Sequence, residues 1–226
     1  MTGKSIIKEN APKLEEFAGI AVQPIAIAVS KLLRARSDQE IIDASLKAGE
    51  VITRYLAILS LASYRARKSS DTEGAIAFAL FGNLSWGHFL KVIQKITSLN
   101  IEHPINVHMA AFRSAKKGKS SGKFNADQGL SSLLKLRNEL GHNLTSMSNA
   151  AASILLKEKT PVDTLVQVLE SVRHLITMPL LLIEEQLLEK RKIRARVLWL
   201  MGETQDPIPH EIGLESAVLN TRAPYV

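Results

Sequence analysis

The longest helical signal in the sequence begins directly after Ser37. Ser37 and Glu40 have the spacing of a capping box, in which the serine caps the start of a helix and the glutamate reaches back toward it. Apolar residues then recur at helical spacing: Ile41, Ile42, Leu46, Val51, Ile52, Tyr55, Leu56, Leu59 and Leu61. The pattern predicts one long helix that continues to about Lys68, with Gly49 as its weak point.

Other segments also carry helix signals. We predict helices from Gln23 to Arg36, from about Ser85 to Leu99, from about Ala126 to Leu140, and from Thr160-Pro161 to about Arg191. Aromatic residues make up only 5% of the chain, which favours helices over a β-sandwich. After residue 192 the periodicity changes, and Ile193 to Leu200 has the pattern of a strand. We therefore predict an all-α helical bundle over residues 5–192 and a short irregular or β tail over residues 193–226, which could begin a further domain.

The composition narrows the choice of partners and compartment. Lys and Arg number 29 against 22 acidic residues, a net charge of +7, which favours a polyanion such as RNA but also fits a merely basic surface. The chain has no cysteine, which excludes disulfides and thiolate metal sites. It shows neither a signal-peptide core nor an apolar run of about 20 residues, the length that spans a bilayer. We therefore expect a cytoplasmic protein with no membrane partner.

One group of residues, just before and after Gly141, forms a candidate functional site. At about 100° per residue, the preceding helix has one apolar stripe, formed by Leu130, Leu133, Leu134, Leu136 and Leu140. Arg137 falls inside this stripe, where a guanidinium is costly unless it is paired or faces a polar pocket or an interface. Gly141 readily ends the helix and redirects the chain. This turn would bring Arg137, Asn138 and His142 to one edge.

The sequence Arg137-Asn138, followed by His142, resembles the Arg-x4-His signature of the HEPN family. The resemblance implies a HEPN-like helical bundle and a metal-independent endoribonuclease without a cofactor, in which the motifs of two chains meet in a dimer. It implies that His142 acts as general base or acid at a ribose 2′-hydroxyl, that Arg137 clamps the phosphate and that Asn138 orients the reacting groups. The chain would then be a toxin or defence effector that acts on RNA as a homodimer, with a regulatory or antitoxin protein as a further partner.

The same residues allow a second interpretation without catalysis. Many HEPN-like domains are non-catalytic, and Arg137, Asn138 and His142 can also lock a helix junction through hydrogen bonds. The segments from Leu84 to His88 and from Leu133 to His142 resemble helical regions at the N-termini of large bacterial signalling and defence proteins. On this interpretation the chain is a dimerisation or sensor module that regulates another effector domain.

A basic loop is predicted between the helix from about Ser85 to Leu99 and the helix from about Ala126 to Leu140. Its cations are Arg113, Lys116, Lys117, Lys119 and Lys123, and it holds no acidic residue. Its glycine and serine content predicts a poorly ordered segment. The loop is either a solvated linker or an RNA-binding segment that contacts the backbone without sequence preference.

Overall fold

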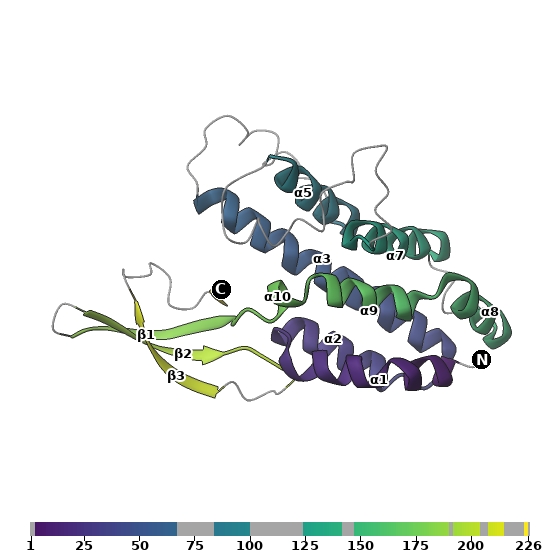
Figure 1. Ribbon diagram of the computed structural model, residues 1–226, viewed down its shortest axis with the longest axis horizontal. Coiled ribbons are helices and arrows are strands. Elements are labelled where there is room, and N and C mark those ends of the chain that lie inside the picture. The colour runs from purple at the N-terminus through teal and green to yellow at the C-terminus, as the bar shows by residue number, and fades with distance from the viewer. Residues whose placement is uncertain are drawn as a thin grey trace.

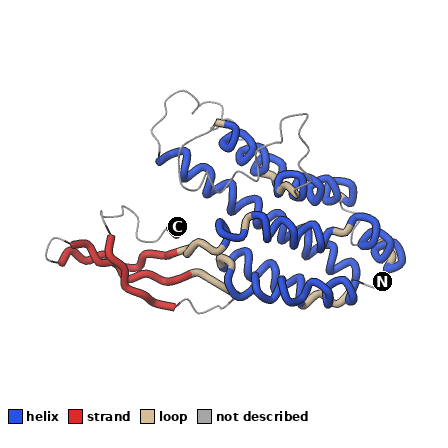
Figure 2. Tube along the Cα trace, in the orientation of Figure 1, coloured by secondary structure: helices blue, strands red, loops and turns tan. Residues whose placement is uncertain are grey.

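The computed structural model describes residues 3–66, 84–99, 124–141, 147–189, 192–203, 208–214 and 224–225. Within these ranges, helices come first and a small antiparallel sheet follows (Figures 1 and 2). The helices are α1 (Gly3–Ile20), α2 (Gln23–Leu33), α3 (Asp38–Ala66), α5 (Trp86–Ser98), α7 (Ala126–Leu140), α8 (Asn149–Lys159), α9 (Pro161–Ser171) and α10 (Arg173–Ile176). The strands are β1 (Leu181–Glu189), β2 (Lys192–Trp199), β3 (Ile208–Leu214) and β4 (Pro224–Tyr225). None of the described helices is long and apolar enough to cross a membrane.

The central element is α3, the long helix predicted from the capping box. It packs against α2, α5, α7, α8 and α9. At its start the Ser37 hydroxyl accepts a hydrogen bond from the Glu40 backbone N–H at 3.2 Å, as predicted. The Glu40 carboxylate reaches back to the N–H of Arg36 at 2.6 Å, one residue before the position that a standard capping box uses.

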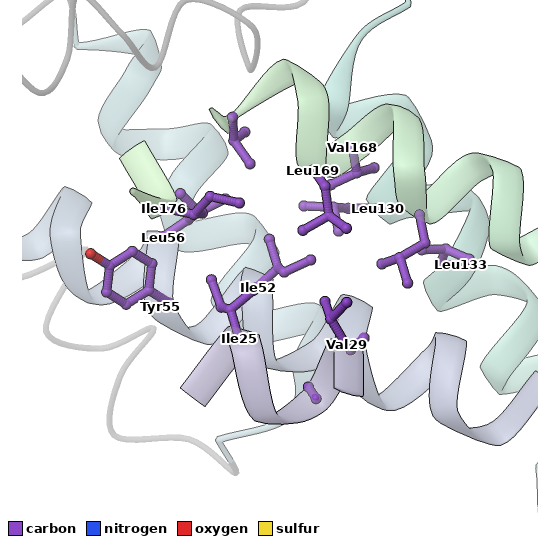
Figure 3. Close-up of a cluster of buried hydrophobic side chains, with 14 of the residues drawn as sticks. Ile25, Val29, Ile52, Tyr55, Leu56, Leu130, Leu133, Val168, Leu169 and Ile176 are labelled. Atoms are coloured by element: carbon purple, nitrogen blue, oxygen red, sulfur yellow. The ribbon is translucent and has the colours of Figure 1, made fainter. Parts of the chain in front are cut away.

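Figure 3 shows part of the core, where buried side chains from several helices meet. It includes Ile25 and Val29 of α2, Ile52 and Leu56 of α3, Leu130 and Leu133 of α7, Val168 and Leu169 of α9, and Ile176 of α10. Because these residues come from segments far apart in the sequence, the helices form one packed bundle. The predicted starts and ends of α2, α5 and α7 are confirmed to within a few residues, whereas α1 and α8 were not predicted as separate helices.

Gly49 lies where α3 packs closely against its neighbours. The helix passes through it, and a β-carbon at this position would lie 3.0 Å from the Leu133 side chain and 3.1 Å from the Trp86 ring. The missing side chain lets α5 and α7 approach α3 closely. Trp86 is buried there, and its Nε1–H donates to the Thr53 hydroxyl at 2.8 Å. The glycine therefore serves packing, and the helix is not interrupted there.

The prediction of a last helix that reaches Arg191 is wrong beyond Ile176. Residues 181–189 form β1, which pairs antiparallel with β2 from Leu181–Trp199 to Glu189–Lys192. The segment is rich in leucine and glutamate, which favour helices in isolation, but pairing with a neighbouring strand overrides this weak preference. Pro179 lies in the connection before β1. The predicted strand at 193–200 is confirmed as β2.

The sheet, in the order β3-β2-β1-β4, extends from one end of the bundle (Figures 1 and 2). It joins the bundle through backbone hydrogen bonds at the junction of α1 and α2. The N–H of Gln23 donates to Leu200 at 2.9 Å, and that of Gly202 donates to Ala21 at 2.8 Å. At the same junction the N–H of Val22 donates to Ile176 of α10 at 2.8 Å, within the bundle. The molecule is thus mainly helical, with a small C-terminal sheet attached at one end.

Candidate functional site

The candidate site is built on the last turn of α7. The helix begins at an Asn125 cap, whose side chain accepts from the Asp127 N–H at 2.9 Å. It ends at Gly141, whose φ of 49° lies in the left-handed region that glycine tolerates, and whose N–H donates to the Arg137 carbonyl at 3.0 Å. Arg137 therefore stands in the final turn, where the helix dipole favours a cation.

The apolar stripe of α7 is only partly as predicted. Leu130, Leu133, Leu136 and Leu140 are buried, and Leu134 is half-buried. Arg137 and the neighbouring Asn138 are exposed. Arg137 lines a recess of about 190 Å³ between α3, α5 and α7, together with Asp43, Leu46, Lys47, Glu50, Trp86, Leu140 and Gly141. Half of the residues that line this recess are charged, which accounts for an arginine within an otherwise apolar stripe.

The charges around the recess are mostly paired with one another. Along α3, Asp43 binds Lys47 at 2.7 Å and Glu50 binds Arg54 at 2.5 Å. Arg137 forms no ion pair with any residue in the described part of the chain. Its guanidinium is thus able to bind an anion that enters from solvent.

The structure places two of the three motif residues. Arg137 and Asn138 are adjacent and exposed at the end of α7, whereas His142 lies outside the described residues. The loop cations Arg113, Lys116, Lys117, Lys119 and Lys123 also lie outside them. The proximity of His142 to Arg137 and the order of the basic loop therefore stay predictions.

Sequence reasoning missed the α3 side of the recess. Asp43, Lys47 and Glu50 belong to no motif, and Trp86 opens α5 and packs against α3. A signal was nevertheless present, because opposite charges stand four residues apart in this long helix, on the side that its apolar residues leave free.

Comparison with known proteins adds no family to this description. No protein-family model matches the chain, and no curated protein or solved structure matches it either. Among the described residues, no group of three or more His, Asp or Glu side chains could hold a metal ion. Arg137, Asn138 and the recess beside them are the described parts of the candidate site.

Proposed function

We propose that the chain is a metal-independent endoribonuclease of the HEPN type that acts as a homodimer. The observation that supports this proposal is the state of Arg137, an exposed arginine beside a recess and without an ion-pair partner in the described part of the chain. Asn138 is exposed next to it, and His142 follows Gly141 directly in the sequence. A cation, an amide and an imidazole on one short segment suit the cleavage of a phosphodiester.

The proposed reaction needs no metal and no cofactor. The ribose 2′-oxygen attacks the adjacent phosphorus, and the bond from phosphorus to the 5′-oxygen breaks. His142 of one chain accepts the 2′-hydroxyl proton, and the partner's His142 in its protonated form donates a proton to the departing 5′-oxygen. The products are a 2′,3′-cyclic phosphate and a 5′-hydroxyl end. Arg137 holds the non-bridging oxygens and stabilises the charge that develops on them, while Asn138 orients the phosphate.

A second function has its own supporting observation. Asp43 and Glu50 line the same recess as Arg137, and carboxylates beside a bound phosphate would weaken its binding by charge repulsion. If this effect dominates, the chain is a non-catalytic dimerisation or sensor module that regulates another effector domain. Arg137 would then connect α7 to a partner surface.

The deciding assay is cleavage of labelled single-stranded RNA in excess chelator. His142→Ala and Arg137→Ala should each lower the rate by on the order of 10²–10⁴-fold, since each removes a group that acts in the transition state. His210→Ala is the matched control, because His210 lies in β3, packs on Trp199 and should not affect the rate. Equal cleavage by the wild type and His142→Ala would refute the catalytic role of His142.

Stability measurements separate the two functions. Arg137 is exposed, so Arg137→Ala should change the free energy of unfolding by no more than about 0.5 kcal/mol. A wild type that never cleaves RNA, together with an Arg137→Ala variant that is clearly less stable or no longer dimeric, would favour the module that regulates another domain.

A further inference from the structure

Between its first turn and Tyr64, the central helix exposes one narrow line of charged residues. Most of α3 is buried, but Asp43, Lys47, Glu50 and Arg54 lie on one side and reach solvent, with side chains 44%, 69%, 23% and 51% exposed. We call these four residues the α3 ridge. Beyond them on the same side of the helix is Ile58, a large apolar side chain that is 60% exposed.

Hollows flank the ridge on both sides. A groove of about 480 Å³ separates it from α2 and is lined on the α2 side by Pro24, Ile27, Ala28, Lys31, Arg34 and Ala35. The Arg137 recess lies between the ridge and helices α5 and α7. Asp43, Lys47 and Glu50 line both hollows, which places the ridge between them. A ridge beside a groove can fit against a rotated copy of itself.

The charges of the ridge are self-complementary when a second α3 runs antiparallel to the first. Their order along the chain is acid, base, acid, base. Residues 43 and 54 have the same midpoint in the sequence as residues 47 and 50. An antiparallel pair that places Asp43 opposite the partner's Arg54 therefore also places Lys47 opposite the partner's Glu50. Each of the four charges on one ridge thus meets an opposite charge on the other. A parallel pair in the same register would instead bring like charges together.

We propose that the α3 ridge and its adjoining groove form the interface of a two-fold homodimer with antiparallel α3 helices. A two-fold interface uses the same patch on both copies, as this charge order requires. Exposed ion pairs contribute little free energy, so the charges set the register. The apolar side chains contribute the affinity, above all Ile27, which lines the groove and is 37% exposed.

This arrangement also bears on the Arg137 recess. The recess borders the ridge at Asp43, Lys47 and Glu50, which surround the midpoint of the antiparallel pair. The two-fold axis therefore passes close to both recesses, and the partner's α3 lies beside each of them. The inference does not rest on the proposed ribonuclease activity, because association can be measured without RNA.

Charge reversal with complementation tests the interface. Lys47→Glu with Arg54→Glu makes the ridge wholly acidic, and Asp43→Lys with Glu50→Lys makes it wholly basic. In sedimentation velocity at micromolar concentration, the wild type should be a dimer and each double variant a monomer. An equimolar mixture of the two variants should regain the dimer, because the acidic ridge then faces the basic one. Circular dichroism checks that each variant is folded.

A matched control changes the same amount of charge elsewhere. Lys91→Glu with Lys95→Glu reverses two exposed cations of α5 that line neither hollow, and this variant should stay a dimer. A monomeric wild type, ridge variants that remain dimers, or a mixture that stays monomeric would each overturn the proposal. Dissociation of the α5 control would overturn it too, because the effect would then come from net charge.

The two proposals can fail separately. His142→Ala should sediment as the wild type does, since it leaves the ridge intact. A dimer that never cleaves RNA would contradict the proposed function alone, and a ridge-dependent loss of the dimer would still support the interface.

Discussion

The helical bundle and the C-terminal sheet differ in the size of the apolar core that holds each of them together. The bundle has one continuous core to which α1, α2, α3, α5, α7, α8, α9 and α10 all contribute. The sheet has its own small cluster, whose buried side chains are Ile183, Ala195 and Val197. Since free energy from burial grows with the apolar area removed from water, the bundle should carry most of the stability. The sheet depends in addition on the backbone hydrogen bonds that connect it to the end of the bundle.

The bundle and the sheet also differ in how far their structure can be predicted from a single segment of sequence. A helix forms its backbone hydrogen bonds within one segment, so its apolar spacing and its caps can be recognised in the sequence of that segment. A strand forms its backbone hydrogen bonds with neighbouring strands. The strand β1 pairs with β2 along its length and with β4 at Leu181 and Leu182. A change in the bundle core should therefore affect the whole molecule, whereas a change in the sheet cluster should act locally.

The largest effect is expected from Trp86→Ala. Trp86 is 1% exposed, packs against Gly49 and donates a hydrogen bond to Thr53. Its removal leaves a cavity between α3 and α5 and should lower the free energy of unfolding by about 3–5 kcal/mol, as measured by urea denaturation. Leu84→Ala is the control, because Leu84 is 56% exposed and should change stability by less than about 0.5 kcal/mol. A loss below about 1 kcal/mol for Trp86→Ala would mean that this region contributes little to the core.

A smaller and more local effect is expected from Ile183→Ala. Ile183 is 2% exposed within the sheet cluster, and its truncation should cost about 2 kcal/mol, the low end for a buried isoleucine. Amide hydrogen exchange should become faster in β1 and β2 while α3 stays protected. Leu187→Ala on the same strand is the control, because Leu187 is 58% exposed. Equal acceleration in α3 would show that sheet and bundle open as one cooperative unit.

The sequence predicted those parts of the molecule that depend on local signals. The bounds Ala126–Leu140 of α7 followed from its leucine spacing and from Gly141, and the start of α3 followed from Ser37. Beyond Ile176 the prediction was wrong, since pairing between strands decides that region. The same limit applies to the candidate site. The exposed Arg137 could be identified on its own helix, but its recess arises only when α3, α5 and α7 pack together.

The smallest effect concerns the ion pair between Glu16 of α1 and Arg173 of α10, next to the junction of bundle and sheet. The guanidinium donates to both carboxylate oxygens, at 2.6 and 2.9 Å, and lies 4.8 Å from the centroid of the Phe17 ring. The hydrogen bond from Arg173 lowers the pKa of Glu16 below its ordinary value of 4.5. NMR titration of the Glu16 carboxyl should therefore show a higher pKa in Arg173→Leu than in the wild type.

The pH dependence of stability follows from the sign of this shift. A carboxyl whose pKa is lower in the folded state stabilises the fold at pH values above its unfolded-state pKa. That stabilisation is lost as pH falls through the folded-state pKa. The wild type should therefore exceed Arg173→Leu in stability slightly at neutral pH, since both side chains are well exposed, and this advantage should shrink below pH 4.5. A Glu16→Gln change should have a smaller effect at neutral pH, because Arg173 also binds Glu170 at 3.3 Å, and it should add little in the Arg173→Leu background. Because α10 carries Ile176, which accepts the N–H of Val22, an intact pair should also slow hydrogen exchange at Val22. Unchanged exchange there in Arg173→Leu would mean that the ion pair does not stabilise the hydrogen bond between Val22 and Ile176.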